Sequence, residues 1–477
     1  MSELHDLSAL QQGAAIAAGE LSPVEITEHY LARTERLGAE VGAFITVTPE
    51  LALEQARAAE AAVRDAAASG AALPPLHGVV VPVKDIDFQA GVRCTMGSAV
   101  YDITPAGDDN LVTAMRASSL VMTGKTNTPE FGLPCYTENA VAPPARTPWD
   151  LSRSAGGSSG GAAAAVAAGL VAAAQGADGG GSIRIPASVC GLVGIKPSRG
   201  RVSNGPLRDP VGDIVCAGPL ARTVADAAAL LDVLAVPFPG DPYYAPGLPP
   251  GETFLAAARR EPGRLRIGRY RTPVIVETDL DPEVVEGYER ASALLESLGH
   301  DVEDVPPPFG PEVFASFEKL WGVLALLTPV MPDNEERLMP LTRWLREQGR
   351  GVSGIEVAGA VSFMRVVARA AMAATAGYDA VLTPSLAQLP VAVGAMRDDD
   401  DPAADFLAQK RFTPFTSPYN ISGQPALSVP LHWTADDLPV GVQLVGRTGE
   451  EALLISLAAQ LEAADPWLER RPEVWHR

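Results

Sequence analysis

Residues 156–197 read GGSSGGAAAAVAAGLVAAAQGADGGGSIRIPASVCGLVGIKP and place two adjacent serines, Ser158 and Ser159, between two pairs of glycines. Such Gly/Ser-rich composition usually behaves as a flexible linker. Here the flanking sequence stays apolar and continues in helix-like and strand-like runs instead of turning polar. We therefore expect both serines to lie inside a folded core, and we ask which chemistry needs two hydroxyl groups there.

The composition describes a globular chain. Of its 477 residues 47% are hydrophobic, which is enough for a substantial core. The beginning of the chain lacks the basic and apolar regions of a signal peptide, and no window approaches 18 unbroken apolar residues. We therefore expect a cytoplasmic protein with no membrane partner.

Cysteine usage and net charge narrow the partners further. The four cysteines are far apart and form no CxxC pair, so we expect them to be buried as small apolar residues. They are Cys94, Cys135, Cys190 and Cys216. The formal net charge of −21 would repel a phosphate backbone, so no nucleic-acid partner is expected.

Helical and strand-like patterns alternate along the chain, which predicts an α/β fold. Residues 1–70 read as helices, and Ser22, Pro23 and Glu25 mark the start of one of them with a capping-box pattern. From 71 to 235, apolar strand-like runs alternate with helical ones. We expect this segment to be the core that holds the two serines.

The second half of the chain is expected to complete the same single domain. Residues 237–252 are rich in Pro and Gly and predict a surface loop, because the α/β rhythm resumes in RLRIGRYR, YDAVLTPS, ALSVPLHW and PVGVQLVGR. Residues 310–412 are more helical, which is typical of an insertion that covers a site. Residues 413–477 are expected to return to the core, so that residues 1–477 form one domain.

The segment around Ser158 matches the G-x-S-x-G nucleophile elbow of α/β-hydrolases, but its context is wrong. The preceding TPWDLSRSA makes a poor buried strand, and the mid-chain histidines, His300 and His432, do not lie in distinctive loops. The six histidines show no paired metal-binding spacing, and the glycine-rich runs lack the Lys-Ser/Thr of a phosphate loop. No metal or cofactor is therefore expected.

Serine chemistry without histidine needs another base, and a lysine can serve if burial keeps it neutral. Lys84 ends the apolar run GVVVPVKDID, where a charged side chain would lie in an unfavourable environment. The alternative is that Lys84 forms a buried ion pair with Asp85 or Asp87.

A second serine element, GADGGGSIRIPA, sets three glycines directly before Ser182. Glycines let a turn aim several backbone N–H groups at one point, which a developing oxyanion requires. The alternative is a tight turn before a strand-like IRIP, which would leave Ser182 without a purpose.

These residues resemble the amidase signature family. The matching motifs are residues 156–197, VPVKD upstream of them, GKTNTPEF (124–131), GPLARTVADAAALLDVLA (218–235), YNISGQPALSVP (419–430) and PVGVQLVGR (439–447). The likeness spans nearly the whole chain and is weakest between about 300 and 412. It implies a large, central, mixed and twisted sheet covered by helices on both faces, and an enzyme that hydrolyses amides.

The resemblance also implies roles for individual residues. Ser182 is the nucleophile, Ser158 relays protons from a position after a cis peptide bond, and Lys84 is the base. The interval of 24 residues between the two serines, 182 − 158, is the family's spacing. The implied oxyanion hole is formed by the backbone N–H groups of Gly179, Gly180, Gly181 and Ser182. The residues implied to support this loop are Asp178, Arg184 and Ser159.

The chain departs from the family at two places. Gly179 stands where many relatives have threonine, which removes a side chain beside the oxyanion hole, and Asp437 replaces a glycine common before LPVG. The sequence after Ser182 looks most similar to bacterial amidases that act on small, cyclic or aryl amides, including nylon-oligomer hydrolases and urethane-cleaving enzymes. We therefore expect an amide or carbamate substrate. The candidates for the acyl pocket are Phe131, Gly132, Leu133 and Tyr136.

Two alternatives stay open on the same scaffold. One is the glutaminase subunit of a tRNA-dependent amidotransferase, which needs partner subunits, and the other is a catalytically inactive binding protein. The resemblance also allows a homodimer. If Lys84 is the base, activity should climb as pH rises and this lysine loses its proton.

Overall fold

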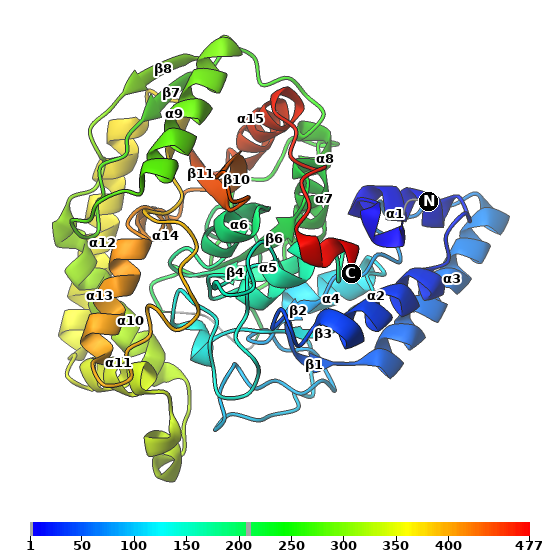
Figure 1. Cartoon of the computed structure of the whole chain (residues 1–477), viewed down its shortest axis with the longest axis horizontal. Helices are drawn as coiled ribbons and strands as arrows, with labels where there is room; N and C mark the ends of the chain where they lie inside the picture. Colours follow the sequence, from blue (N-terminus) through cyan, green and yellow to red (C-terminus); the bar gives the residue numbers. More distant parts are fainter. Residues whose placement is uncertain (1–2, 207–210) are drawn as a thin grey trace.

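The centre of the structure is an eight-stranded sheet (Figure 1). The computed structural model describes residues 3–206 and 211–477. In spatial order the strands are β4 (Ala173–Asp178), β6 (Cys216–Ala221), β5 (Val193–Lys196), β10 (Ala426–Trp433), β11 (Pro439–Gly446), β9 (Ala380–Pro384), β7 (Arg266–Arg269) and β8 (Asp301–Asp304). Neighbours from β4 to β9 pair antiparallel, whereas β7 pairs parallel with both β9 and β8. The expectation of a mixed sheet is confirmed.

Helices cover both faces of this sheet, as expected. They are α5 (Gly160–Ala167) and α6 (Arg184–Cys190) on one face, and α7 (Val224–Leu234), α9 (Pro282–Ser297) and α15 (Glu451–Ala464) on the other. Adjacent residues of a strand point to opposite faces of the sheet. In β11, Gly441 therefore faces the helix layer that contains α6, and Val440 faces the layer that contains α9. A Cβ on Gly441 would meet Ser188 of α6, whereas Val440 lies against Gly287 of α9.

A three-stranded sheet lies beside β4. Its order is β1 (Phe44–Val47), β3 (Gly124–Thr126) and β2 (Val83–Lys84). The N–H of Lys84 donates to the side chain of Gln175 on β4, at 2.9 Å. The end of β2 is thereby fixed to the edge of the large sheet.

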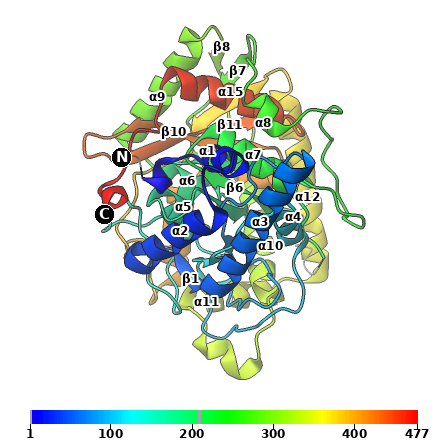
Figure 2. The same ribbon diagram turned by 90° about the vertical axis from the view of Figure 1, so that its right-hand side faces the viewer.

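The amino-terminal segment is mainly helical, as expected, but strand β1 lies between its second and third helices and was not predicted. Figure 2 shows this segment on the side that faces the viewer. Its helices are α1 (Ala9–Ala17), α2 (Pro23–Leu37) and α3 (Pro49–Ser69). Ser22 Oγ accepts hydrogen bonds from the N–H groups of Val24 and Glu25, so the predicted helix start is confirmed. The Pro/Gly-rich residues 237–252 contain no helix or strand and are largely exposed, as predicted.

Residues 310–412 are mainly helical. The helices are α10 (Phe314–Leu327), α11 (Pro340–Arg350), α12 (Gly354–Thr375) and α13 (Pro402–Phe412). Strand β9 of the central sheet also lies in this range, so part of the range belongs to the core. By length and composition alone, α12 could cross a membrane, and 22% of its most apolar window is buried. The absence of a membrane partner therefore stays a prediction.

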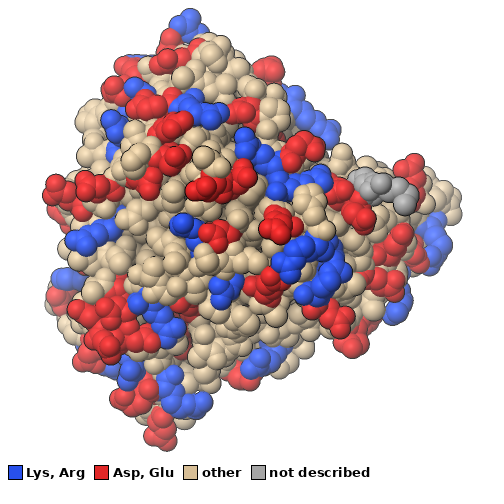
Figure 3. All heavy atoms as spheres, in the orientation of Figure 1, with Lys and Arg blue, Asp and Glu red and all other residues tan. Residues whose placement is uncertain are grey.

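Charged side chains of both signs are interspersed over most of the face drawn in Figure 3. With 58 acidic and 37 basic residues, the chain as a whole is acidic. This distribution agrees with the prediction that no nucleic acid binds, but it does not test it.

One buried carboxyl group should make the stability of the fold depend on pH. Burial raises the pKa of Glu462 on α15 to about 7, although the N–H of Val224 donates to it at 3.1 Å. The folded state then holds a proton that the unfolded state releases near pH 4.5, so stability should fall as pH rises through about 7. We expect Glu462→Gln to raise the Tm at pH 8.5 by an amount equivalent to about 2 kcal/mol and to change it little at pH 5.

Differential scanning calorimetry at the two pH values checks this prediction. Glu469→Gln, which changes an exposed side chain near the same end of the chain, is the control. An equal change of Tm at both pH values for Glu462→Gln would show that the carboxyl group does not titrate as expected.

Candidate active site

Lys84 and Ser158 meet in the interior. Lys84 Nζ lies 2.7 Å from Ser158 Oγ, and it also donates to the backbone oxygen of Ala177 at 3.4 Å. The two residues are 0% and 2% exposed, and the peptide bond between Gly157 and Ser158 is cis. A buried amine within hydrogen-bond distance of a hydroxyl group can exchange a proton with it when the amine is neutral.

In the structure, the ion-pair partner of Asp85 is a different lysine from Lys84. Asp85 pairs with Lys125 on β3, at 3.5 Å, and also accepts from the side chain of Thr95. Asp87 accepts from Gln175 Nε2 at 2.9 Å. Both carboxylates therefore help to hold the loop after β2, which positions Lys84.

Ser182 lies beside the two adjacent serines. Its backbone oxygen accepts a hydrogen bond from the N–H of Ser159 at 3.1 Å, so the two serine segments are joined directly. Ser159 Oγ in turn bonds to the backbone of Ala177, the residue that also accepts from Lys84. Ser182 is 6% exposed and lines a pocket, which makes it accessible to a small substrate.

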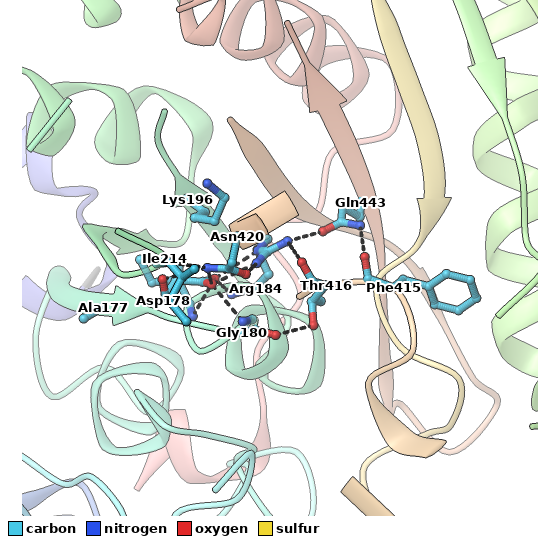
Figure 4. A network of polar contacts seen from close by, with 12 residues as sticks. Ala177, Asp178, Gly180, Arg184, Lys196, Ile214, Phe415, Thr416, Asn420 and Gln443 are labelled. Atoms are coloured by element: carbon cyan, nitrogen blue, oxygen red, sulfur yellow. Dashed lines mark hydrogen bonds and ion pairs between the residues drawn. The ribbon is translucent and has the colours of Figure 1, made fainter. Parts of the chain in front are cut away.

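Asp178, at the end of β4, fixes the loop before Ser182 (Figure 4). Its carboxylate accepts from the N–H groups of Gly181 at 2.8 Å and Ile183 at 3.1 Å. It also forms a buried bidentate pair with Arg184, at 2.8 and 2.9 Å. Burial alone would raise the pKa of Asp178, but the adjacent guanidinium outweighs it and holds the pKa below its usual range. This carboxylate therefore stays charged at neutral pH.

Arg184 links this loop to the carboxyl-terminal part of the core (Figure 4). Its Nη1 donates to the backbone oxygen of Thr416 at 2.8 Å and to Gln443 Oε1 at 2.6 Å, and its Nη2 donates to Asn420 Oδ1 at 2.7 Å. Lys196 lies in the same buried region, and burial lowers its pKa. The roles implied for Asp178 and Arg184 agree with this placement.

The IRIP segment is a helix, so the expectation of a strand is wrong. Helix α6 begins at Arg184, and Pro186 falls in its first turn, where proline is tolerated because no intrahelical N–H bond is lost. The Asp178 carboxylate accepts the N–H of Ile183, just before the helix. A negatively charged acceptor stabilises the start of a helix. The four residues IRIP alone do not show this acceptor, because Asp178 lies five residues before Ile183.

The backbone N–H groups before the nucleophile are not all equivalent. Gly181 already donates its N–H to Asp178. Among the described residues, the N–H groups of Gly179, Gly180 and Ser182 have no recorded acceptor. Of the four N–H groups that the family resemblance implies, the Gly181 N–H is thus occupied within the protein, and Gly181 adopts a φ of 133° that shapes the loop.

A pocket opens at Ser182. Its wall is apolar and aromatic, and α10 and α13 contribute much of it. The residues that line it include Leu133, Gly180, Phe317, Glu318, Trp321 and Lys410. The expectation that part of residues 310–412 lies over the site agrees with these contributions.

The four candidates for the acyl pocket are placed differently. Leu133 lines the pocket, whereas in the described part of the chain Phe131, Gly132 and Tyr136 do not. A Cβ on Gly132 would lie 3.5 Å from Ser158 Oγ, so this glycine lies against Ser158. Tyr136 donates its hydroxyl to Asp405 at 2.6 Å, and Phe131 packs edge-on against Tyr101. These two side chains therefore pack within the protein.

The comparisons with known proteins agree with this geometry. The amidase family model matches residues 25–455. The 6-aminohexanoate-cyclic-dimer hydrolase of Paenarthrobacter ureafaciens is 35% identical, over 98% of this chain and 96% of its own, and the acylamidase of Rhodococcus erythropolis is 32% identical, over 98% of each. A solved structure of 6-aminohexanoate cyclic dimer hydrolase superposes with a TM-score of 0.91 at 33% identity and covers 99% of this chain and 100% of its own. The chain belongs to the amidase family and is an amidohydrolase.

Several site residues were not identified from the sequence. Asn420 and Gln443 lie in motifs that were quoted, YNISGQPALSVP and PVGVQLVGR, but no role was assigned to them. Both bond to Arg184 across more than 230 residues of chain, and such contacts leave no local pattern. Trp321 and Phe317 lie in the least regular part of the sequence, where only the aromatic spacing of a helix could have pointed to them.

Proposed function

We propose that this amidohydrolase cleaves the C–N bond of small and aryl amides, and of carbamates, through an acyl-enzyme on Ser182. The observation that carries the proposal is the buried 2.7 Å contact between Lys84 Nζ and Ser158 Oγ, next to the Ser182 segment. A neutral lysine and two hydroxyl groups suffice to take the proton from the attacking serine and later to deliver it to the departing nitrogen.

In the proposed acylation, Ser182 Oγ attacks the carbonyl carbon and passes its proton to Ser158, while Ser158 passes its own proton to Lys84. The N–H groups of Gly179, Gly180 and Ser182 stabilise the oxyanion. Collapse of the tetrahedral intermediate breaks the C–N bond, and the proton returns along the relay to the departing nitrogen. Water then attacks the acyl group by the same route and releases the acid.

A carbamate presents an equivalent carbonyl carbon, and the aromatic pocket suits an aryl group on either type of substrate. The test is the release of aniline from a matched acyl anilide and carbamate anilide by the isolated chain. Turnover of both supports the full proposal, and turnover of the acyl anilide alone removes the carbamate part. Failure on both, with glutamine hydrolysed only in the presence of partner subunits, would favour the amidotransferase alternative.

A further inference from the structure

The glycine at position 179 is not required by the backbone. Gly181 adopts a φ of 133°, which side chains disfavour, whereas the φ of Gly179 lies outside this range. A Cβ at position 179 would instead lie 3.3 Å from two indole carbons of Trp321 and 3.3 Å from Val215 Cγ2. These distances are shorter than ordinary van der Waals contact, so a side chain at position 179 would press on the indole and on Val215.

A second ring continues the same surface. Phe317 lies one helical turn before Trp321 on α10, and the two rings stack with centroids 5.3 Å apart and planes 17° from parallel. A Cβ on Gly180 would lie 3.6 Å from Phe317 Cζ. The edges of the two stacked rings therefore lie against Gly179 and Gly180, the first two of the three glycines before the nucleophile. Both rings also line the pocket.

The charges in this pocket balance each other. Glu318 on α10 pairs with Lys410 on α13 at 2.8 Å, and the two side chains are 38% and 25% exposed. Lys410 Nζ also lies 5.3 Å from the centroid of the Phe406 ring. Because these opposite charges are already paired with each other, the largely apolar and aromatic lining suits an uncharged group.

We propose that Trp321 is a specificity-determining residue and that, with Phe317, it forms an aromatic wall for a planar, conjugated and uncharged acyl group. The inference rests on the proposed acylation of Ser182, because the acyl group must stay in this pocket until water releases it. The absence of a side chain at Gly179 leaves room for the indole, and a planar aromatic group can pack edge-to-face or offset against these rings more closely than a puckered ring of similar size can.

The test compares N-methylbenzamide with N-methylcyclohexanecarboxamide, which share the amine and differ in the flatness of the acyl group. The measured quantity is the ratio of the two kcat/KM values. We expect Trp321→Leu to lower this ratio about five- to tenfold relative to the unchanged chain, as loss of an aromatic stacking contact predicts. Trp321→Phe, which keeps a flat ring, should lower it less than threefold.

Two further variants sharpen the test. Gly179→Thr should displace the indole and lower the same ratio, whereas Trp433→Leu, which changes a tryptophan at the end of β10 that packs on Trp149 and lies outside the pocket lining, should leave the ratio unchanged. Trp321→Phe also keeps the inference testable if Trp321→Leu does not fold.

The outcomes separate this inference from the proposed function. If the unchanged chain hydrolyses both amides and the ratio is the same in Trp321→Leu, the specificity role is wrong while the proposed function stands. If Trp321→Leu leaves this ratio unchanged but lowers kcat/KM for acetanilide relative to N-cyclohexylacetamide, the aromatic wall binds the leaving group and the acyl assignment is wrong. If neither amide nor any anilide is hydrolysed, the proposed function itself fails.

Discussion

Ser182→Ala should lower kcat for anilide hydrolysis by at least about 10⁴-fold, as loss of the nucleophile does in serine hydrolases. The reason is that no bond can form between enzyme and acyl group, although the pocket and the N–H groups remain. Because the change removes one oxygen atom from a residue at the pocket surface, the Tm should stay within about 2 °C of the unchanged chain. Steady-state release of aniline and thermal unfolding measure the two quantities.

The matched control is Ser188→Ala. Ser188 lies on the helix that follows the nucleophile, and its hydroxyl accepts from the N–H of Gly441 at 3.0 Å, away from the pocket. This variant should keep activity within a few-fold. Residual activity of Ser182→Ala above a few per cent would mean that another group performs the attack.

Lys84→Met should lower kcat/KM by about 10³-fold, because general-base transfer contributes about 10²- to 10⁴-fold to such reactions. Methionine keeps an apolar stem of similar length in a position that is 0% exposed, so the fold should persist. The unchanged chain should gain activity as pH rises, since only the neutral amine accepts a proton. The pH profile of kcat/KM measures this dependence.

The control for charge is Lys319→Met, which changes an exposed lysine of α10 that pairs with Glu356. Its activity and pH profile should match those of the unchanged chain. An activity that is flat from acidic to alkaline pH in the unchanged chain would argue against Lys84 as the base, even if Lys84→Met is inactive.

Four strands of the central sheet were predicted from the sequence, three of them as apolar runs bounded by turn residues and one as the alternating pattern RLRIGRYR. RLRIGRYR, YDAVLTPS, ALSVPLHW and PVGVQLVGR became β7, β9, β10 and β11. The helix start capped by Ser22 was also predictable, since the capping interaction is local. The IRIP helix was missed because its start depends on a carboxylate five residues earlier.

The site residues that belong to a family motif were predictable from the sequence. Those that reach the site only through the packing of distant segments were not. Lys84 and Ser158 were expected to cooperate, and the structure brings them within 2.7 Å. The partners of Arg184 lie on distant segments, and the aromatic wall at Trp321 depends on how α10 packs against the loop at Gly179. No local spacing encodes such contacts, which explains why three of the four pocket candidates do not line the pocket.

The central claim is that the acyl group is transferred to Ser182. Its most direct test is to quench a reaction with an activated aryl ester after a short time, digest the protein and measure the mass of the peptide that contains Ser182. The account predicts one acyl group on Ser182 that disappears in Ser182→Ala and accumulates only slowly in Lys84→Met. Rapid turnover with no acylated peptide, or acylation that persists elsewhere in Ser182→Ala, would contradict it.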